Sequence, residues 1–292
     1  MSAFLEVTAA GLFHAGVLFL VAAGLQLVFG VQKIVNLACG STYALGAYLG
    51  ITVATTAMLW GLPPAAAVLV LPVAATLVAL LGPPVERLLR TVYDRDESFQ
   101  LLLTFALVLM AQDAIRGIWG ATPRQVDGIY LAFGQMQLLG ARIPVYNLMV
   151  IAAALALAIL LGSFLKRTGF GLLLRATAEN RAMAAGLGVD TRRIYVAVFT
   201  LGTFLGALGG ALVVPSAAAS LEMAVELVVE AFAVVVIGGL GSMPGALAGA
   251  VIVGLLRAGA LMTFPEAEVL AVYAVVVAVL LLRPAGLFGK TA

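Results

Sequence analysis

The sequence predicts an all-α membrane protein, a polytopic bundle of about nine transmembrane helices with short broken or re-entrant segments. Of its 292 residues, 63% are hydrophobic and only 10% are charged, whereas a soluble domain carries about a quarter charged residues. The mean hydropathy is +1.15. Apolar segments of about 20 residues, the length that crosses a bilayer, follow one another along the chain. Lipid is therefore the solvent for most of the surface, and residues 1–292 form a single transmembrane domain.

The apolar segments divide the chain into nine expected spans. They lie near residues 9–30, 35–59, 64–82, 99–119, 144–165, 194–214, 227–240, 245–263 and 269–283. The seventh and the ninth are short for a full crossing. A set of eight spans with one short segment re-entrant is the alternative.

The distribution of Lys and Arg orients this set. Basic residues gather in the 83–98 and 166–193 loops and in the tail, whereas the 215–230 connection holds only acidic charges. Because basic loops stay on the cytoplasmic side, nine spans place the C-terminus in the cytoplasm and the N-terminus outside. Arg124 and Arg142, in the outer 120–143 loop, run against this trend. Glu86 and the charged run 94–97 indicate a solvated cytoplasmic loop.

Composition and spacing favour neither an enzyme nor a metal site. The single cysteine, Cys39, excludes an intrachain disulfide and a cysteine metal cluster. Cys39 and the single histidine, His14, have no sequence neighbours of the kind that a nucleophile or a metal needs. We therefore expect no catalytic residue and no metal. No basic stripe interleaved with aromatic residues suggests nucleic-acid binding.

Small residues and two interruptions mark the spans. The steps G-T-F-L-G (202–206) and G-A-L-A-G (245–249) predict close helix approach. The stretches 29–46 and 236–249 break the apolar pattern, and unwound backbone at membrane depth is tolerated only inside protein or beside a wet cavity. Paired interruptions of this kind point to a translocation path. A tight cytoplasmic turn plus a glycine-lined packing face is the alternative.

If the interruptions line a path, their polar and small residues are its candidate lining. This set is Asn36, Gly40, Ser41, Tyr43, Gly238, Gly239, Gly241, Ser242 and Pro244, with Glu230 from the seventh span. Glu226 and Glu230 share one helical face, and an acid near the membrane interior is a functional candidate. Asp113 and Arg116 lie three residues apart and are expected to neutralise each other.

The segment 175–193, RATAENRAMAAGLGVDTRR, is the one basic, alanine-rich insert in the second half of the chain. Residues 176–185 favour a helix, Gly186 and Gly188 favour its end, and Asp190 is suited to cap the next helix. Ala178, Ala182 and Ala185 then fall on one face as a smooth ridge. Such a ridge fits a cleft on a partner, with arginines around it to meet acidic groups. An ordinary basic loop is the alternative.

Four segments, in order, carry a family resemblance. They are GLQLVFGVQKIVNLACGSTYALGAYL, RATAENRAMAAGLGVDTRRI, AFAVVVIGGLGSMPGALAGAVIVG and LLRPAGLFGK. Together they resemble the permeases of bacterial ABC importers for branched-chain amino acids, along essentially the whole chain. The chain departs from the family at three positions. Family members are expected to carry His where this chain has Cys39, often Glu where it has Ser41, and frequently Lys where it has Glu230. These departures put the solute in question, not the transport class.

The resemblance implies a permease of the bacterial cytoplasmic membrane that works by alternating access. It makes 166–193 the coupling loop to an ATPase. The implied coupling residues are Arg175, Ala178, Glu179, Asn180, Ala182, Ala185, Gly186, Gly188 and Asp190. The sequence holds no phosphate-binding G-x-x-x-x-G-K-[ST] motif, because Pro284 stands where the tail would need its first glycine. ATP and Mg are therefore expected on separate ABC ATPase subunits, and this chain needs no cofactor of its own.

The other implied partners are a second homologous permease chain and a periplasmic or extracellular solute-binding protein. Because the candidate path is mostly apolar or neutral, we expect leucine, isoleucine or valine as the solute. Aromatic acids, short amides and urea are the alternatives within the class. A self-sufficient secondary carrier is the alternative outside it, but such carriers place ion-coupling acids at the membrane midplane. A membrane scaffold without transport would have no discontinuous spans.

Overall fold

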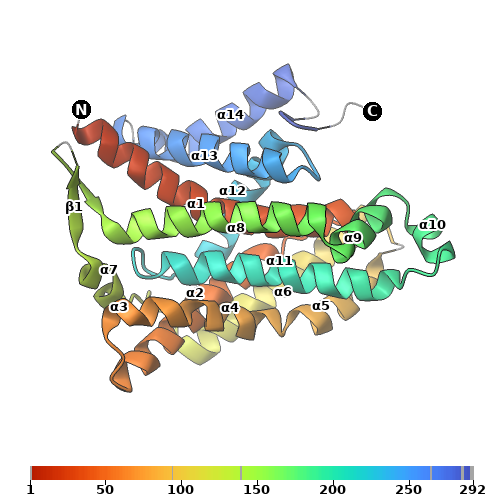
Figure 1. Cartoon of the computed structure of the whole chain (residues 1–292), viewed down its shortest axis with the longest axis horizontal. Coiled ribbons are helices and arrows are strands. Elements are labelled where there is room, and N and C mark those ends of the chain that lie inside the picture. The colour runs from red at the N-terminus through yellow and green to blue at the C-terminus, as the bar shows by residue number, and fades with distance from the viewer. Residues whose placement is uncertain (1, 94, 139, 264, 284–285, 290–292) are drawn as a thin grey trace.

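The computed structural model describes residues 2–93, 95–138, 140–263, 265–283 and 286–289. Its helices run along the long axis of an elongated bundle (Figure 1). Within these residues, seven helical segments are long and apolar enough to cross a membrane. They are α1 (Ser2–Gln32), α2 (Cys39–Leu59), the segment α3 to η2 (Pro64–Val92), α6 (Glu97–Trp119), α8 (Val145–Arg167), α11 (Thr191–Val213) and α13 (Met243–Thr263).

The two segments expected to be short are helical as well. They form α12 (Met223–Gly238) and α14 (Glu268–Leu282), of 16 and 15 residues. Each of the nine apolar segments therefore overlaps a helix, although some of their residues, such as 35–38 and 239–240, lie outside the helices. The multi-pass helical architecture is confirmed, whereas a count of nine membrane crossings stays a prediction.

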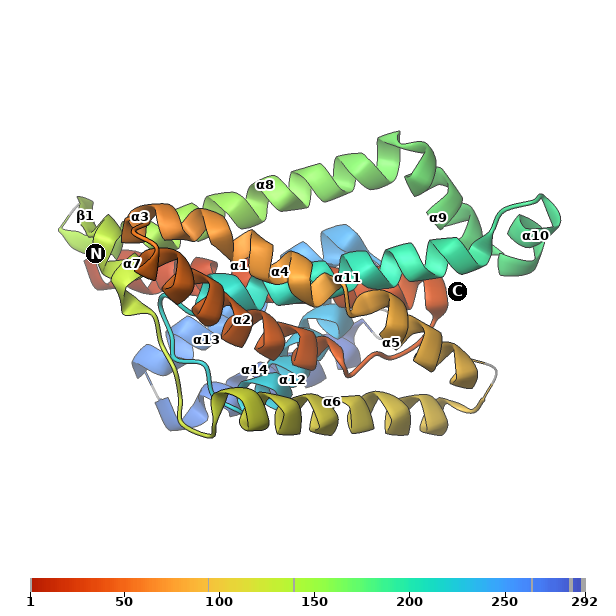
Figure 2. The same cartoon turned by 90° about the horizontal axis from the view of Figure 1, so that it is seen from below.

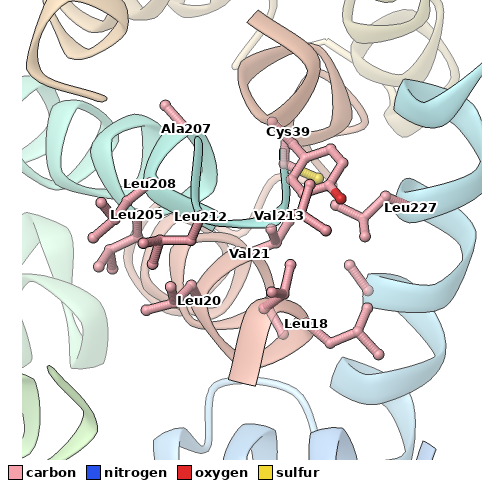
Figure 3. Packing of buried hydrophobic residues seen from close by; sticks show 14 of the residues in the cluster. Leu18, Leu20, Val21, Cys39, Leu205, Ala207, Leu208, Leu212, Val213 and Leu227 are labelled. Carbon is pink, nitrogen blue, oxygen red and sulfur yellow. The ribbon is translucent and has the colours of Figure 1, made fainter. Parts of the chain in front are cut away.

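Helix α1 is the centre of the bundle. Of its most apolar 18 residues, 78% are buried, against 17% in α6 and in α8, which therefore lie at the periphery. It contacts α13, α11, α8 and α12. In Figure 3, Leu18 and Val21 of α1 lie between Leu208 and Leu212 of α11 on one side and Leu227 of α12 on the other. The core is thus a layer of branched aliphatic side chains around one central helix.

Glycines set how closely the helices approach. A Cβ added at Gly24 of α1 would lie 2.6 Å from the carbonyl oxygen of Gly202 in α11. A Cβ at Gly206 would lie 2.6 Å from Oγ1 of Thr42 in α2. Gly245 of α13 likewise lies against the backbone of Gly238 in α12. Both small-residue steps therefore act at helix crossings, where the missing side chains let two backbones meet.

The connections at one end of the bundle carry most of the basic residues. Arg90, from the end of α3–η2, lines a pocket together with Arg181 and Arg192, so the 83–98 and 166–193 connections meet there. At the other end, Arg124 pairs with Ala219 in a backbone bridge, and Glu6 accepts a hydrogen bond of 2.9 Å from the Arg142 amide. The grouping of the loops expected from their charge is therefore present.

The 120–143 connection is more ordered than the sequence suggested. It contains a short helix, α7 (Asp127–Phe133), and an antiparallel hairpin of β1 (Gln135–Leu138) and β2 (Ala141–Pro144). Positive φ angles at Gly134 and Gly140 allow the two sharp changes of direction. Because the strands have only four residues each, the apolar and polar pattern was too short to reveal them.

The third span continues past its expected end at residue 82. Helices α3 (Pro64–Ala67), η1 (Val68–Val70), α4 (Leu71–Ala79), α5 (Gly82–Leu89) and η2 (Arg90–Val92) form an almost continuous path. Glu86, expected in a solvated loop, is fully buried. It pairs with Arg90 one turn later and accepts a 3.2 Å hydrogen bond from the Tyr93 hydroxyl. These partners compensate its burial. Asp94, from the same charged run, lies outside the described residues.

The expected helix over 176–185 is two helices. Helix α9 (Gly169–Glu179) ends before Asn180, whose backbone is extended, and α10 (Arg181–Gly186) follows it. The Asn180 side chain accepts a 2.9 Å hydrogen bond from the Met183 amide and so caps α10. The prediction of one ridge of Ala178, Ala182 and Ala185 is therefore wrong, because a capping residue outweighed the alanine-rich pattern. Figure 2 shows α10 projecting beyond the end of the bundle.

Candidate functional site

The first interruption runs inside the bundle. Helix α1 ends at Gln32, residues 33–38 are not helical, and α2 starts at Cys39 beside the middle of α11. Gly206, which meets Thr42, lies fifteen residues after the start of α11 at Thr191, or about 22 Å along it. The unwound segment therefore reaches well into the molecule (Figure 2). Ile34, Asn36 and Ala38 of this non-helical segment are buried, whereas Lys33 is exposed. Such an unwound segment inside the protein matches the predicted broken span.

The candidate residues of this stretch are all buried. Oδ1 of Asn36 accepts a 3.0 Å hydrogen bond from the Ala38 amide and shapes the turn before α2. Gly40 lies against the backbone of Ala224 in α12. Oγ of Ser41 is buried and has no hydrogen-bond partner in the described part of the chain. Tyr43 is buried against Gly210 of α11. A buried hydroxyl without a partner is unusual, and it marks this bend as a place where a polar group could bind.

The second interruption joins α12 to α13. Gly239 and Gly241 have φ angles of 95° and 81°, which favour glycine. Oγ of Ser242 accepts a 3.2 Å hydrogen bond from the Gly245 amide at the start of α13. Pro244 lies in the first turn of the same helix, where a missing N–H costs little. These candidates therefore build a tight, glycine-dependent turn between α12 and α13.

Sequence reasoning missed Gln26, which holds this turn. Its Nε2 donates to the Gly239 carbonyl at 2.9 Å, and its Oε1 accepts from the Gly241 amide at 2.5 Å. Gln26 lies in α1 and is 2% exposed. The C-terminal segment joins the same place, because the Leu287 amide donates to the Ile237 carbonyl at 2.8 Å. A lone glutamine inside an apolar span was the signal that could have identified it.

Glu230 belongs to a charged cluster between three helices. Its carboxylate contacts Nε2 of His14 in α1 at 2.8 Å and Nη1 of Arg257 in α13 at 2.5 Å. The three side chains are between 17% and 30% exposed. His14 and Arg257 also line a groove of about 480 Å³ between α1 and α13. No sign of these partners of His14 was visible in the sequence, because they lie more than 200 positions away along the chain.

Other charged residues in the spans behave differently. Asp113 and Arg116 are both exposed on α6, and the ion pairs found among the described residues do not join them. Glu226 is exposed, whereas Glu230, one turn later, is largely buried. Although the two acids share one face of α12, only Glu230 therefore lies inside the bundle, and Glu226 remains at its surface.

The predicted coupling residues form the tip of the molecule. Arg175 and Glu179 are exposed on α9, where Ala178 is half-buried. Ala182, Ala185 and Gly186 are exposed on α10, and Gly188 turns the chain with a φ of 86°. Oδ1 of Asp190 accepts a 3.2 Å hydrogen bond from the Arg193 amide, which confirms it as the cap of α11.

Two residues of this tip were not among the predicted ones. Met183 and Leu187 are 65% and 82% exposed beside Ala182 and Ala185. The tip therefore presents a small apolar surface with arginines around it.

Known proteins resemble the chain along most of its length. The family model described as "Branched-chain amino acid transport system / permease component" matches residues 7–282. The high-affinity branched-chain amino acid transport system permease protein BraD of Pseudomonas aeruginosa is 25% identical over 280 residues, covering 93% of this chain and 91% of that protein. The Escherichia coli K12 permease protein LivH is 25% identical over 281 residues, with the same coverage.

An archaeal relative and a solved structure extend the comparison. The probable branched-chain amino acid transport permease protein LivH of Methanocaldococcus jannaschii is 27% identical over 257 residues, covering 83% of this chain and 76% of that protein. A chain of PsaBC from Streptococcus pneumoniae, solved in complex with Fab, aligns with a TM-score of 0.51 at 14% identity. It covers 96% of this chain and 92% of that one, and this likeness concerns the fold alone.

Proposed function

Because this chain belongs to the branched-chain amino acid transport system permease family, we propose that it imports branched-chain amino acids or similar small, largely apolar solutes. It is a transmembrane permease subunit of an importer, in which separate ABC ATPase subunits supply the energy. The observation that carries the proposal is the family match over residues 7–282 on a chain with seven span-length helices. Its relatives of known name are permeases for these amino acids.

The orientation follows from the charges at the two ends of the bundle. The end that holds Arg90, Arg181 and Arg192 faces the cytoplasm. With α12 and α14 counted as crossings, the chain passes the membrane nine times, and its C-terminus is cytoplasmic. The hairpin β1–β2 and α7 then face the outside, where a solute-binding protein delivers its cargo.

Helix α10 is the coupling element. Its exposed alanines, with Met183 and Leu187, offer an apolar surface small enough to enter a cleft on an ATPase subunit. The Asn180 cap and the turn at Gly188 hold this short helix at both ends. ATP-driven movement of the partner is transmitted through α9 and α11 to the spans, and it favours one packing of the bundle over another.

The path passes the unwound segment 33–38 and the start of α2. Ser41 supplies the hydrogen-bonding hydroxyl, and Gly40 and Tyr43 border it. The α12–α13 turn, held by Gln26, is the second moving part. Glu230 is engaged by His14 and Arg257, which supports a role in joining α1, α12 and α13 and not in binding the solute directly.

The coupling role predicts that a charge on α10 separates hydrolysis from transport. In Ala182→Glu the carboxylate would enter an apolar contact, and burying an unpaired charge costs several kcal/mol. Uptake of labelled leucine should fall at least about tenfold, while the assembly retains ATPase activity that no longer responds to the solute. Transport is measured as uptake into membrane vesicles, and ATP hydrolysis is measured as phosphate release.

Ala176→Glu is the matched control, because Ala176 is also an exposed alanine but lies on α9 and not on α10. It should transport normally. Normal uptake by Ala182→Glu would exclude α10 as the contact with the ATPase.

Purification tests the partners and the solute class. In mild detergent the chain should bring ATPase subunits and a second, homologous permease chain. The cognate binding protein should be stabilised against heat by leucine, isoleucine or valine. If only aromatic acids, short amides or urea stabilised the binding protein, one of these would be the transported solute in place of the branched-chain amino acids. A chain that transports without any ATPase would overturn the proposal as a whole.

A further inference from the structure

A cavity at the basic end of the bundle is not used by the proposed transport cycle. It has a volume of about 330 Å³ and lies between η2, the start of α10 and the start of α11. Its lining residues are Arg90, Arg181, Thr191, Arg192 and Tyr195. Three arginines from two separate connections therefore converge on one space.

The cavity carries a net positive charge. Arg90 is neutralised by the buried Glu86, and the adjacent Arg193, outside the lining, pairs with Asp190 at 2.9 Å. Arg181 and Arg192 form none of the ion pairs found in the described part of the chain. Two guanidinium groups are thus left to meet an anion.

The walls of the cavity are anchored in the core. The Arg181 guanidinium lies 5.2 Å from the centre of the Tyr195 ring, which packs edge-on against Tyr93 at 5.7 Å. The Tyr93 hydroxyl donates to the fully buried Glu86, and Nε2 of Gln32 donates to the Tyr195 carbonyl at 3.1 Å. The site is therefore built from packed aromatic and ionic contacts, which hold one guanidinium in place before a ligand arrives.

The depth of the cavity identifies the source of the anion. It lies where the apolar segment Pro64–Val92 ends and where the segment Thr191–Val213 begins. In the proposed topology this is the level of the lipid headgroups, where basic pockets between helices bind anionic lipids. Arginine matches phosphate with two parallel hydrogen bonds.

We propose that this cavity binds the phosphate of an anionic phospholipid headgroup. The phosphate bridges Arg181 of α10 and Arg192 of α11 next to Arg90 of η2. Because α10 is held at its start by this contact, anionic lipid links the projecting tip to the bundle. A zwitterionic lipid brings its own cation and is bound more weakly.

The test measures lipid retention and not transport, so its result is independent of the solute and of the coupling role. The full chain, purified with whatever subunits accompany it, is delipidated and titrated with phosphatidylglycerol or phosphatidylcholine. Bound lipid is counted by native mass spectrometry. The wild type should prefer phosphatidylglycerol. Arg181→Gln/Arg192→Gln should weaken that binding about thirtyfold, because each cation near an anionic lipid contributes about fivefold.

Arg167→Gln/Arg175→Gln is the matched control. It removes two exposed arginines from the same end of the bundle, and neither lines the cavity. Its affinity for phosphatidylglycerol should stay within about threefold of the wild type. Arg181→Lys/Arg192→Lys keeps both charges but loses the planar fork, and it should bind at an intermediate level. This pair also serves if the glutamine variant does not fold.

Three outcomes overturn the proposal. An equal loss of phosphatidylglycerol binding in the control variant would mean that lipid binding depends only on the overall charge of this end of the bundle. Displacement of phosphatidylglycerol by inorganic phosphate at equal concentration would make free phosphate the ligand. Loss of an ATPase subunit from Arg181→Gln/Arg192→Gln, with lipid retention unchanged, would assign the cavity to an acidic side chain of that partner.

Discussion

Single polar residues inside the spans hold distant parts of this protein together. Gln26 binds the α12–α13 turn through both atoms of its amide, and Glu86 gathers Arg90 and Tyr93 at the basic end. Burial, and next the charge of Glu86, raise the pKa of the Tyr93 phenol above its ordinary value of 10.0. The hydroxyl therefore stays protonated and keeps its hydrogen bond to the carboxylate at neutral pH.

At this scale we predict that Glu86 is a stabilising residue. Glu86→Ala leaves the Arg90 guanidinium half-buried without its carboxylate, and breaking a buried pair costs about 3 kcal/mol. The free energy of unfolding, measured by titration with denaturing detergent, should fall by roughly that amount. Glu86→Gln, which keeps an acceptor for Arg90 and Tyr93, should lose less.

Glu97→Ala is the control for this change, because Glu97 is an exposed acid at the same end of the bundle. It should leave stability almost unchanged. Equal effects at positions 86 and 97 would show that only net charge matters.

The elements of this bundle owe their arrangement to glycine crossings and to caps. The backbone of α1 meets that of α11 at Gly24 and Gly202, and α2 approaches α11 through Gly206 and Gly210. Asn180 and Asp190 cap α10 and α11. The break at Asn180 shows that one capping side chain redirects an alanine-rich segment, because its hydrogen bond satisfies an amide that a continuous helix would bond to its own backbone.

At the crossing of α1 with α11, we predict that one added methyl group lowers the stability of the protein markedly. In Gly24→Ala the new Cβ would lie 2.6 Å from the Gly202 carbonyl oxygen, so the helices must move apart. Overpacking of this kind costs about 1–3 kcal/mol. Thermal unfolding in detergent measures the loss.

Gly117→Ala tests whether the effect comes from the crossing. No heavy atom lies within 4 Å of a Cβ built at Gly117 in α6, and alanine favours a helix by up to about 1 kcal/mol over glycine. This variant should be as stable as the wild type or slightly more stable. Destabilisation as large as that of Gly24→Ala would refute the crossing as its cause.

The whole molecule is a bundle with two chemically different ends. Arginines from the 83–98 and 166–193 connections meet at one end, and the α7–hairpin segment covers part of the other (Figure 1). The helix α10 projects from the basic end (Figure 2). The central α1 contacts α2, α8, α9, α11, α12 and α13.

The two ends are predicted to lie on opposite sides of the membrane. Trp60 is 86% exposed in the turn after α2, and Leu187 is 82% exposed after α10, whereas the native Cys39 is buried. A membrane-impermeant maleimide should label Trp60→Cys in intact cells and Leu187→Cys only in inverted vesicles. The reverse pattern would invert the orientation, and labelling of both from one side would contradict the topology.

The sequence alone determined that lipid surrounds most of the protein, which segments are helical, and which family the chain belongs to. The length of an apolar segment indicates directly whether it can cross a lipid bilayer. Helix caps such as Asp190 and small-residue steps such as Gly202–Gly206 are local patterns, so they can be recognised within one segment of the chain. The bend at Asn36 and Ser41 was visible for the same reason, because polar residues there interrupt an apolar run.

Only the tertiary structure decided which polar groups meet. His14, Glu230 and Arg257 come from three helices, Gln26 reaches a turn more than 200 positions away, and Arg90 shares a cavity with Arg181 and Arg192. Such pairings depend on how helices rotate and cross, and those choices result from packing over the whole bundle. No local periodicity records them, so the sequence named the residues but not their partners.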